Sequence, residues 1–360
     1  MSAPTALAAR LATMIEAGGP ITVAEFMGHA VGHYYATREP FGRGGDFVTA
    51  PEVSQMFGEI VGAWLVQAWL DAGRPRPVRL VELGPGRGTL MADIVRTARL
   101  VPDFLASASL HLVETSPRLK RRQTETLAGA PLRPAWHDRL DELSAGFLLL
   151  VANEFFDALP IRQFVRADGA WRERVVGLDA AGRLAFGLGP GGLAENEVPP
   201  ALTAAAGPGA ILEVSPAATA VAGEIGGRVA RHGGAALLVD YGHAETGLGD
   251  TLQAVGAHRF ADPLAAVGDV DLTAHVDFSA LARAVRAAGA AAWGPMQQGD
   301  FLLALGLLER AGRLGRDGDA ALRDSLSAAV ERLAGPQAMG RLFKVLAVTP
   351  LGPPPPPFGG

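Results

Sequence analysis

A glycine-rich segment is the part of the sequence whose residue types and spacing point most clearly to chemistry. Gly84-Pro85-Gly86-Arg87-Gly88 follows a short β-type run, residues 78–83, and precedes a helical pattern of apolar residues. A strand, a tight glycine turn and a helix open the nucleotide site of doubly wound α/β proteins. Only a backbone without side chains can turn so sharply and let a ligand approach. The segment therefore predicts a ligand site, and the alternative is a plain glycine turn without a ligand.

The glycine spacing and two acidic residues indicate which ligand this turn accepts. A dinucleotide fingerprint reads Gly-x-Gly-x-x-Gly, whereas the third glycine here, Gly88, comes one residue early. Glu82 lies two residues before the first glycine, where a carboxylate repels a pyrophosphate and suits a cation. Glu114 ends the next strand-like run, 109–113, and can accept two hydrogen bonds from a ribose diol. The pattern favours S-adenosylmethionine, a sulfonium without phosphate, over NAD.

A second acidic segment, Asn153-Glu154-Phe155-Phe156-Asp157, follows the buried-strand run 147–152. Ligands of open α/β sheets bind at the carboxyl ends of the strands, so this segment is expected to face the same crevice as Gly84–Gly88. Asn153 offers an amide carbonyl, while Glu154 and Asp157 offer carboxylates. The alternative is that the two acids cap a following helix at its N-terminus.

Another Gly-rich segment, residues 42–47, contains Asp46 and is expected to fold over a ligand. The residues after it are typical of a helix start. Thr49 would be the N-cap, Pro51 would lie in the first turn, and Glu52 would be the acid of a capping box.

The composition excludes several classes of function. The 360-residue chain is 49% hydrophobic and 19% charged, with a net charge of −5, and no long basic run suggests nucleic acid as a partner. There is no cysteine, so disulfides, thiolate metal sites and a cysteine nucleophile are absent. His275 lies between two acids but lacks further ligands at zinc spacing, and no metal is expected. No apolar run is long enough for a membrane span and no secretory signal is visible, which predicts a bacterial cytoplasmic protein.

The periodicity predicts an N-terminal helical extension and an α/β core. Helices are expected at 4–18, at 22–36 with Thr22 as N-cap, and at 54–70. A mostly parallel sheet is expected because helical patterns separate most of the strand candidates. These candidates are 79–83, 109–113, 134–137, 147–152, 235–240 and 343–348.

Two regions do not fit a minimal core. Residues 161–190 alternate polar and apolar around Asp168-Gly169 and predict an inserted β-hairpin. Helices at about 276–289, 300–314 and 318–333 predict a helical lobe within residues 256–340. The proline run 353–357 is typical of a polyproline II segment. Such a segment can be a ligand for a proline-binding module, but it is more often a disordered end. The expected segments are 1–77, 78–160, 161–230, 231–348 and 349–360.

Several phrases of the sequence together resemble one family, the MidA-type methyltransferases, to which the mitochondrial complex I assembly factor belongs. The resemblance runs from about residue 20 to 347. The phrases are residues 45–59, 81–91, 153–160, 249–254, 271–278 and 342–346.

The resemblance implies a class I, Rossmann-like methyltransferase with a seven-stranded, mostly parallel sheet that uses S-adenosylmethionine. By the family motif, Gly84, Gly86 and Gly88 would shape the cofactor turn and Glu114 would hold the ribose. Glu82 and Asn153 would complete the cofactor site. Trp136 and His137 end the third strand, where the adenine would lie.

The family resemblance also implies a substrate, because its studied mitochondrial members form symmetric dimethylarginine on the 49-kDa-type subunit of complex I. Of the Asn-Pro-Pro-Tyr motif of amino-methylating enzymes only Asn153 is shared, which disfavours a nucleobase or glutamine target. Glu154 and Asp157, helped by Asp46, are the residues expected to grip the guanidinium and accept its proton. A non-catalytic complex I chaperone is the alternative, and a eukaryotic source would place the protein in the mitochondrial matrix.

Overall fold

The computed structural model describes residues 5–38, 49–256 and 259–359. The chain forms two compact units, and each is assembled from three separated stretches rather than from consecutive segments. The smaller unit contains residues 1–47, 157–219 and 245–277, and the larger unit contains residues 48–156, 220–244 and 278–360. Among the helices of the described part of the chain, none combines the length and the apolar character needed to cross a bilayer.

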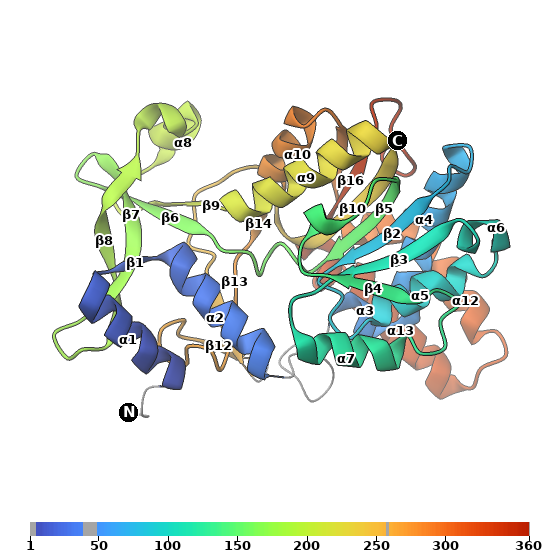
Figure 1. The fold of residues 1–360 in the computed structure, drawn as a ribbon, viewed down its shortest axis with the longest axis horizontal. Coiled ribbons are helices and arrows are strands. Elements are labelled where there is room, and N and C mark those ends of the chain that lie inside the picture. The colour runs from blue at the N-terminus through green and yellow to red at the C-terminus, as the bar shows by residue number, and fades with distance from the viewer. Residues whose placement is uncertain (1–4, 39–48, 257–258, 360) are drawn as a thin grey trace. The chain divides into compact units, whose positions relative to one another are not determined.

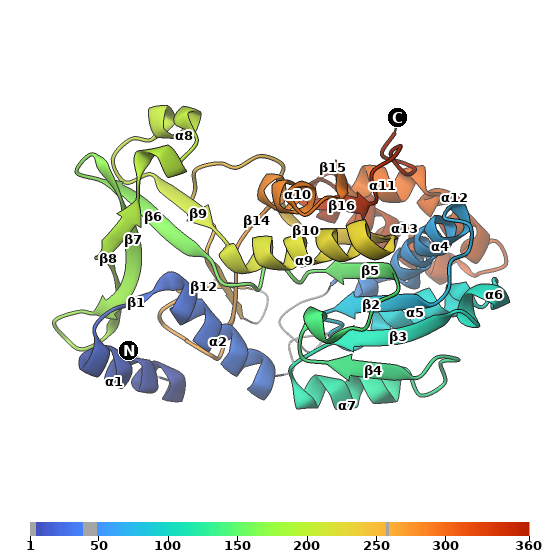
Figure 2. The same ribbon diagram turned by 45° about the horizontal axis from the view of Figure 1, so that its top comes forward.

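The larger unit is built on a mixed sheet with the strand order β15-β16-β10-β5-β2-β3-β4. Strands β16 to β4 are labelled in Figure 1, and β15 is labelled in Figure 2. The strands from β10 to β4 are parallel to their neighbours, whereas β16 runs antiparallel to both β10 and β15. The prediction of a mostly parallel seven-stranded sheet is therefore confirmed only as a mixed α/β sheet. The strands that make up this order are β2 (Val78–Leu83), β3 (Ala108–Val113), β4 (Pro134–His137), β5 (Phe147–Asn153), β10 (Gly234–His243), β15 (Ala291–Gln297) and β16 (Phe343–Thr349).

Helices cover this sheet because its central strands are apolar on both faces. Leu80, Leu149 and Leu237 belong to one core cluster with α4 and α5, and the alternate residues of the same strands are equally buried. Helices α9 and α10 lie side by side along the sheet (Figure 2). The helices are α3 (Ala50–Val53), α4 (Gln55–Asp71), α5 (Thr89–Ala98), α6 (Pro102–Leu105), α7 (Pro117–Thr126), α9 (Pro216–His232), α10 (Phe278–Ala287), α11 (Gln298–Ala304), α12 (Leu307–Gly315), α13 (Ala320–Ala334) and α14 (Met339–Leu342), with a 3-10 turn at Leu140–Glu142.

Two glycines of α4 allow it to approach α5 closely. A Cβ atom at Gly58 would lie 2.5 Å from Cβ of Asp93, and one at Gly62 would lie 3.0 Å from Cα of Ile94. Real Cβ atoms essentially never come as near as the first distance and seldom as near as the second, so larger residues would push α4 and α5 apart.

The C-terminal half of the larger unit differs from the prediction in three places. Strand β15 was not expected, because its Gly294-Pro295 sequence is unusual in a strand and is tolerated here at the edge of the sheet. The predicted helix 300–314 is interrupted at Gly306, whose φ of 92° is left-handed. The proline-rich tail is packed rather than disordered, since Trp64 Nε1 donates to the Pro356 carbonyl at 2.7 Å and the rings of Phe301 and Phe358 are 5.9 Å apart.

The smaller unit confirms the two N-terminal helices and the hairpin. Thr22 forms a capping box with Glu25 at the start of α2. Asp168 and Gly169 both have positive φ in the turn that joins β6 and β7, as in a type I′ turn. A five-stranded sheet contains β1-β7-β6-β9 with β8 beside β7, and a second sheet has the order β12-β11-β13. The elements are α1 (Ala6–Gly18), β1 (Ile21–Thr22), α2 (Val23–Thr37), β6 (Arg162–Ala167), β7 (Ala170–Leu178), β8 (Leu184–Leu193), α8 (Pro200–Ala205), β9 (Ile211–Val214), β11 (Gln253–Gly256), β12 (Arg259–Ala261), β13 (Asp271–Thr273) and β14 (Val276–Asp277), with a 3-10 turn at Glu195–Glu197.

Candidate active site

The glycine segment forms the predicted turn between β2 and α5. Gly84, Gly86 and Gly88 have φ values of 59°, 51° and 82°, which L side chains rarely adopt. A Cβ at Gly84 would also lie 2.9 Å from Cδ2 of Phe155, so the turn has no room for a side chain there. The strand, turn and helix predicted from sequence are thus confirmed as structure.

Glu82 places a buried acid beneath this turn. The residue is 3% exposed, and its carboxylate accepts a hydrogen bond from the backbone N–H of Met91 in α5. Its Oε2 atom is buried and has no hydrogen-bond partner in the described part of the chain. Burial raises the pKa of the Glu82 carboxyl to about 8, against an ordinary value of 4.5, because the charged form loses its hydration.

Asn153 supplies a second unsatisfied acceptor at the neighbouring strand end. Its Nδ2 donates to Oε1 of Glu154 at 3.1 Å, whereas its Oδ1 is buried without a partner among the described residues. Glu82 is paired with Val151 in the parallel ladder, so Glu82 and Asn153 lie on the same face of the sheet. When Glu82 is ionised, the site has two buried acceptors that need donors, which fits a ligand with an ammonium group and does not fit a diphosphate.

Glu114 directly follows β3 and accepts hydrogen bonds from groups around the glycine turn. Its Oε1 accepts from the Ser116 N–H at 2.8 Å, and its Oε2 accepts from Gln123 Nε2 at 3.2 Å. Burial raises the pKa of Glu114, and these hydrogen bonds oppose the shift. A carboxylate has about four acceptor positions, so Glu114 retains capacity for a diol.

Sequence reasoning missed Gln123, which joins three parts of the site. This fully buried residue of α7 donates from Nε2 to the Gly86 carbonyl at 2.9 Å as well as to Glu114, and its Oε1 accepts from Trp136 Nε1 at 2.8 Å. The available signal was its position four residues after Leu119, where a polar residue interrupts the apolar stripe of a charged helix.

Trp136 and His137 contact different partners because successive residues of a strand point to opposite faces. Trp136 contacts Gln123, whereas Nε2 of His137 lies 2.9 Å from Nδ1 of His111, which in turn lies near Ser109. Burial, then the nearby His137 and Arg79, lower the pKa of His111 to about 4, so this ring is neutral at pH 7. An adenine-binding role for either residue stays a prediction.

Glu154 follows β5 with a left-handed φ of 51°. Its Oε1 accepts from the backbone N–H of Ala50 at 3.1 Å, at the start of α3. Within the described residues no helix follows Glu154 directly, so the alternative that it caps the next helix is wrong; it contacts an earlier one instead.

Helix α3 is tied to the glycine turn by Glu52. Its Oε1 accepts from Thr89 Oγ1 at 2.6 Å, and its Oε2 lies 3.3 Å from Arg87 Nη1. The expected capping box is therefore wrong: Thr49 makes no side-chain cap, and Glu52 contacts α5 and the glycine turn instead.

The two other predicted catalytic acids belong to different parts of the chain. Asp157 is 7% exposed and begins a stretch of the smaller unit, where its carbonyl accepts from the Ala274 N–H. Burial, Asp271 and Asp157 together raise the pKa of Tyr35, whose hydroxyl donates to Asp271 at 3.1 Å. Asp46 lies outside the described residues.

The phrase at residues 249–254 forms a polar network within the smaller unit. Asp250 accepts from Arg174 Nη1 and Gln163 Nε2, both at 2.8 Å. The Thr251 N–H donates to Glu213 at 2.9 Å. These contacts join β6, β7 and β9 to the following loop, which gives the phrase a structural role.

The mixed sheet, the glycine turn and the strand-end acids define a class I methyltransferase-like fold. Residues 60–296 match the family of S-adenosyl-L-methionine-dependent methyltransferases. The chain belongs to this family, and its cofactor is S-adenosylmethionine.

Similar proteins of known name and structure agree with this assignment. The chain is 36% identical over 365 residues to the mitochondrial protein arginine methyltransferase NDUFAF7 of Danio rerio, covering 94% of this chain and 85% of that protein. It is 36% identical over 366 residues to the protein of the same name from Homo sapiens, covering 93% and 81%. A crystal structure from Burkholderia thailandensis, bound to S-adenosyl-homocysteine, superposes with a TM-score of 0.82 at 32% identity, covering 96% of this chain and 92% of that one.

Proposed function

We propose that this methyltransferase modifies arginine side chains of a protein, and that its substrate is the 49-kDa-type subunit of respiratory complex I. The relatives named protein arginine methyltransferases support the first part. The observation that supports a particular site for this reaction is the position of the Glu154 carboxylate. It accepts a hydrogen bond at the start of α3, beside the glycine turn. The proposed address is the bacterial cytoplasm, or the mitochondrial matrix if the source is eukaryotic.

Four residues of the larger unit would hold the cofactor. Glu82 and Asn153 present the two buried acceptors without partners that an ammonium group would satisfy. Glu114, positioned by Gln123, would accept hydrogen bonds from the ribose hydroxyls. When bound, S-adenosylmethionine supplies a methyl group on a sulfonium, already activated for displacement.

The carboxylate of Glu154 has two tasks in this proposal. A guanidinium is planar, always charged and a poor nucleophile. A carboxylate that accepts two of its N–H groups aligns the remaining nitrogen and localises charge away from it. When that nitrogen bonds to carbon it gives up one proton, which Glu154 accepts and passes to water. A shared role for Asp157 and Asp46 stays a prediction.

The experiment is transfer of an isotopically labelled methyl group from S-adenosylmethionine to the purified bacterial 49-kDa-type subunit, followed by peptide mass spectrometry. The proposal expects label on arginine. An equal amount of the large subunit of an unrelated dehydrogenase serves as the control substrate and should stay unlabelled. Label on lysine or on a glutamine amide, or no transfer to the subunit under conditions in which the cofactor binds, contradicts the proposal.

A further inference from the structure

The backbone at Glu154 is unusual for a residue at the end of a central strand. Within the described residues, three non-glycine residues have a left-handed φ, namely Arg74, Glu154 and Asp168. Asp168 lies in a hairpin turn, where this conformation is common for aspartate. Glutamate has no such preference, so the surrounding structure must hold Glu154 in place. The N–H of Glu154 itself donates to the Val239 carbonyl at 2.9 Å, and Asp240 holds the two residues that follow.

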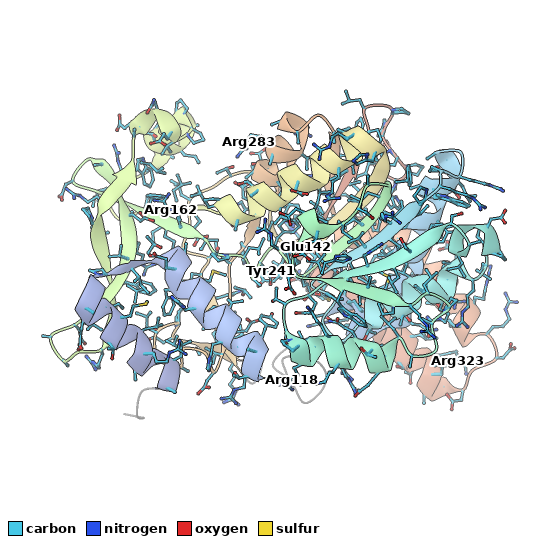
Figure 3. The ribbon with its side chains drawn as sticks, in the orientation of Figure 1. Arg118, Glu142, Arg162, Tyr241, Arg283 and Arg323 are labelled. Carbon is cyan, nitrogen blue, oxygen red and sulfur yellow. The ribbon has the colours of Figure 1, made fainter. Side chains whose placement is uncertain are left out.

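Asp240 lies near the end of β10, whose Val239 is paired with Asn153 in the parallel ladder, and it is 1% exposed. Its Oδ2 accepts from two successive backbone N–H groups, those of Phe155 at 3.1 Å and Phe156 at 2.9 Å. Its Oδ1 accepts from the N–H of Tyr241, the residue labelled in Figure 3, at 2.9 Å. Hydrogen bonds from N–H groups to a carboxylate are stronger than those to neutral acceptors.

The turn held by Asp240 contacts both α3 and the glycine turn. The side chain of Glu154 reaches the Ala50 N–H of α3. The ring of Phe155 is so close to Gly84 that a Cβ there would be 2.9 Å from it. One carboxylate from β10 therefore fixes where the acid and the aromatic ring lie relative to the glycine turn.

We propose that Asp240 is a positioning residue for methyl transfer: by accepting the Phe155 and Phe156 N–H groups it keeps Glu154 in the left-handed conformation that directs its carboxylate to the site. The expected effect on kcat rests on the proposed function. The expected role of Asp240 in holding the turn does not. In this proposal Asp240 acts through the backbone of the turn, and Glu154 is the residue that contacts the substrate.

The kinetic test is a cycle of Asp240→Asn, Glu154→Gln and the double variant. Asparagine keeps the volume, but its NH₂ group cannot accept a hydrogen bond, so either the turn or Tyr241 loses its acceptor. Asp240→Asn should lower kcat at least about tenfold, with the dissociation constant of S-adenosylhomocysteine and the KM for the protein changed less than about threefold. In the Glu154→Gln background, Asp240→Asn should lower kcat by less than about threefold, because the carboxylate that Asp240 positions is already absent.

Asp93→Asn is the matched control, because Asp93 is also a buried acid of the larger unit, 5% exposed. Its kcat per cofactor-binding site should equal that of the wild type, whatever its melting temperature. Equal fractional losses of kcat from Asp240→Asn in the two backgrounds would overturn the inference. A wild type that transfers no methyl group to arginine contradicts the proposed function instead.

A second measurement needs no variant and no activity. In wild-type protein, the amides of Phe155 and Phe156 should exchange hydrogen as slowly as that of Leu150 within β5, because both are bonded to the carboxylate of Asp240, which is 1% exposed. Fast exchange at both amides beside a protected Leu150 would overturn the inference even if Asp240→Asn fails to fold.

Discussion

The turns that follow β2 and β5 both pass through left-handed backbone, but they reach it in opposite ways. The β2 turn uses glycines at 84, 86 and 88, which adopt positive φ without strain. The β5 turn uses Glu154, held by hydrogen bonds from the next two residues to Asp240. The turn after β2 leaves space because its glycines have no side chains, whereas the turn after β5 sets the direction of the Glu154 side chain. A turn that binds a ligand needs space, whereas the catalytic role proposed for Glu154 needs a side chain at a fixed position.

The largest expected effect comes from filling the first turn. Gly86→Val should weaken S-adenosylhomocysteine binding at least about 100-fold, because valine cannot adopt a φ of 51° without strain and its bulk occupies the turn. Isothermal titration calorimetry measures the change. Gly32→Ala is the control, since a Cβ at Gly32 meets nothing within 4 Å. Unchanged affinity in Gly86→Val would show that the ligand does not lie at this turn.

Changing the side chain that the second turn directs should affect transfer and leave binding alone. Glu154→Gln should lower kcat about 100-fold, since it removes the proton acceptor, and should leave cofactor affinity within about threefold. Glu125→Gln, at an exposed glutamate of α7, should change neither. A fully active Glu154→Gln enzyme on its protein substrate would remove the role assigned to this residue.

A moderate effect should follow from loosening the support of the first turn. Gln123→Ala removes the hydrogen bonds to Gly86 and Glu114, and should weaken S-adenosylhomocysteine about tenfold. The neighbouring exposed residue gives the control Thr124→Ala, which should bind like the wild type. Equal affinities of the two variants would mean that Gln123 only fills space.

The smallest effect concerns the stability of the cofactor-free protein. The pKa of Glu82 rises from 4.5 to about 8 on folding, so its stabilising contribution is complete below pH 4.5 and is lost as the pH rises through 8. Asp93, whose pKa burial raises to about 6, acts in the same direction at lower pH. The melting temperature of the wild type should therefore fall between about pH 6.5 and 8. Glu82→Gln should remove that fall, so that at pH 8 the variant melts a few degrees higher than the wild type. A variant with the pH slope of the wild type would contradict the shifted pKa.

The sequence predicted those features that depend on local patterns. The strand runs, the glycine turn and the Thr22 cap are recognisable because neighbours in the chain determine them. Asp240 is the last residue of the strand candidate 235–240, but its partners Phe155 and Phe156 lie more than 80 residues earlier. Its role therefore becomes visible only once β5 and β10 are paired. Strand β15 was missed because its Gly-Pro sequence reads as a loop until β16 pairs with it.

For the residues of the candidate site, the sequence indicated which side chains are acidic or polar, but it did not indicate which residues they contact. A glutamate at residue 52 signals a helix cap by its spacing, yet it contacts Thr89 and Arg87 instead, since α3 is only four residues long and lies against the glycine turn. Gln123 was missed because amides carry no charge signal, although its burial makes it the centre of the Glu114 network.

The central claim is that buried acids around a glycine turn accept a cationic ligand without phosphate. Calorimetry of S-adenosylmethionine and NAD at pH 7, in two buffers of different ionisation enthalpy, tests it most directly. We predict that S-adenosylmethionine binds with release of up to about one proton, because the Glu82 carboxyl ionises beside the ligand's ammonium, and that NAD does not bind. Binding of NAD at this site, or binding of S-adenosylmethionine without any proton release, would contradict the account.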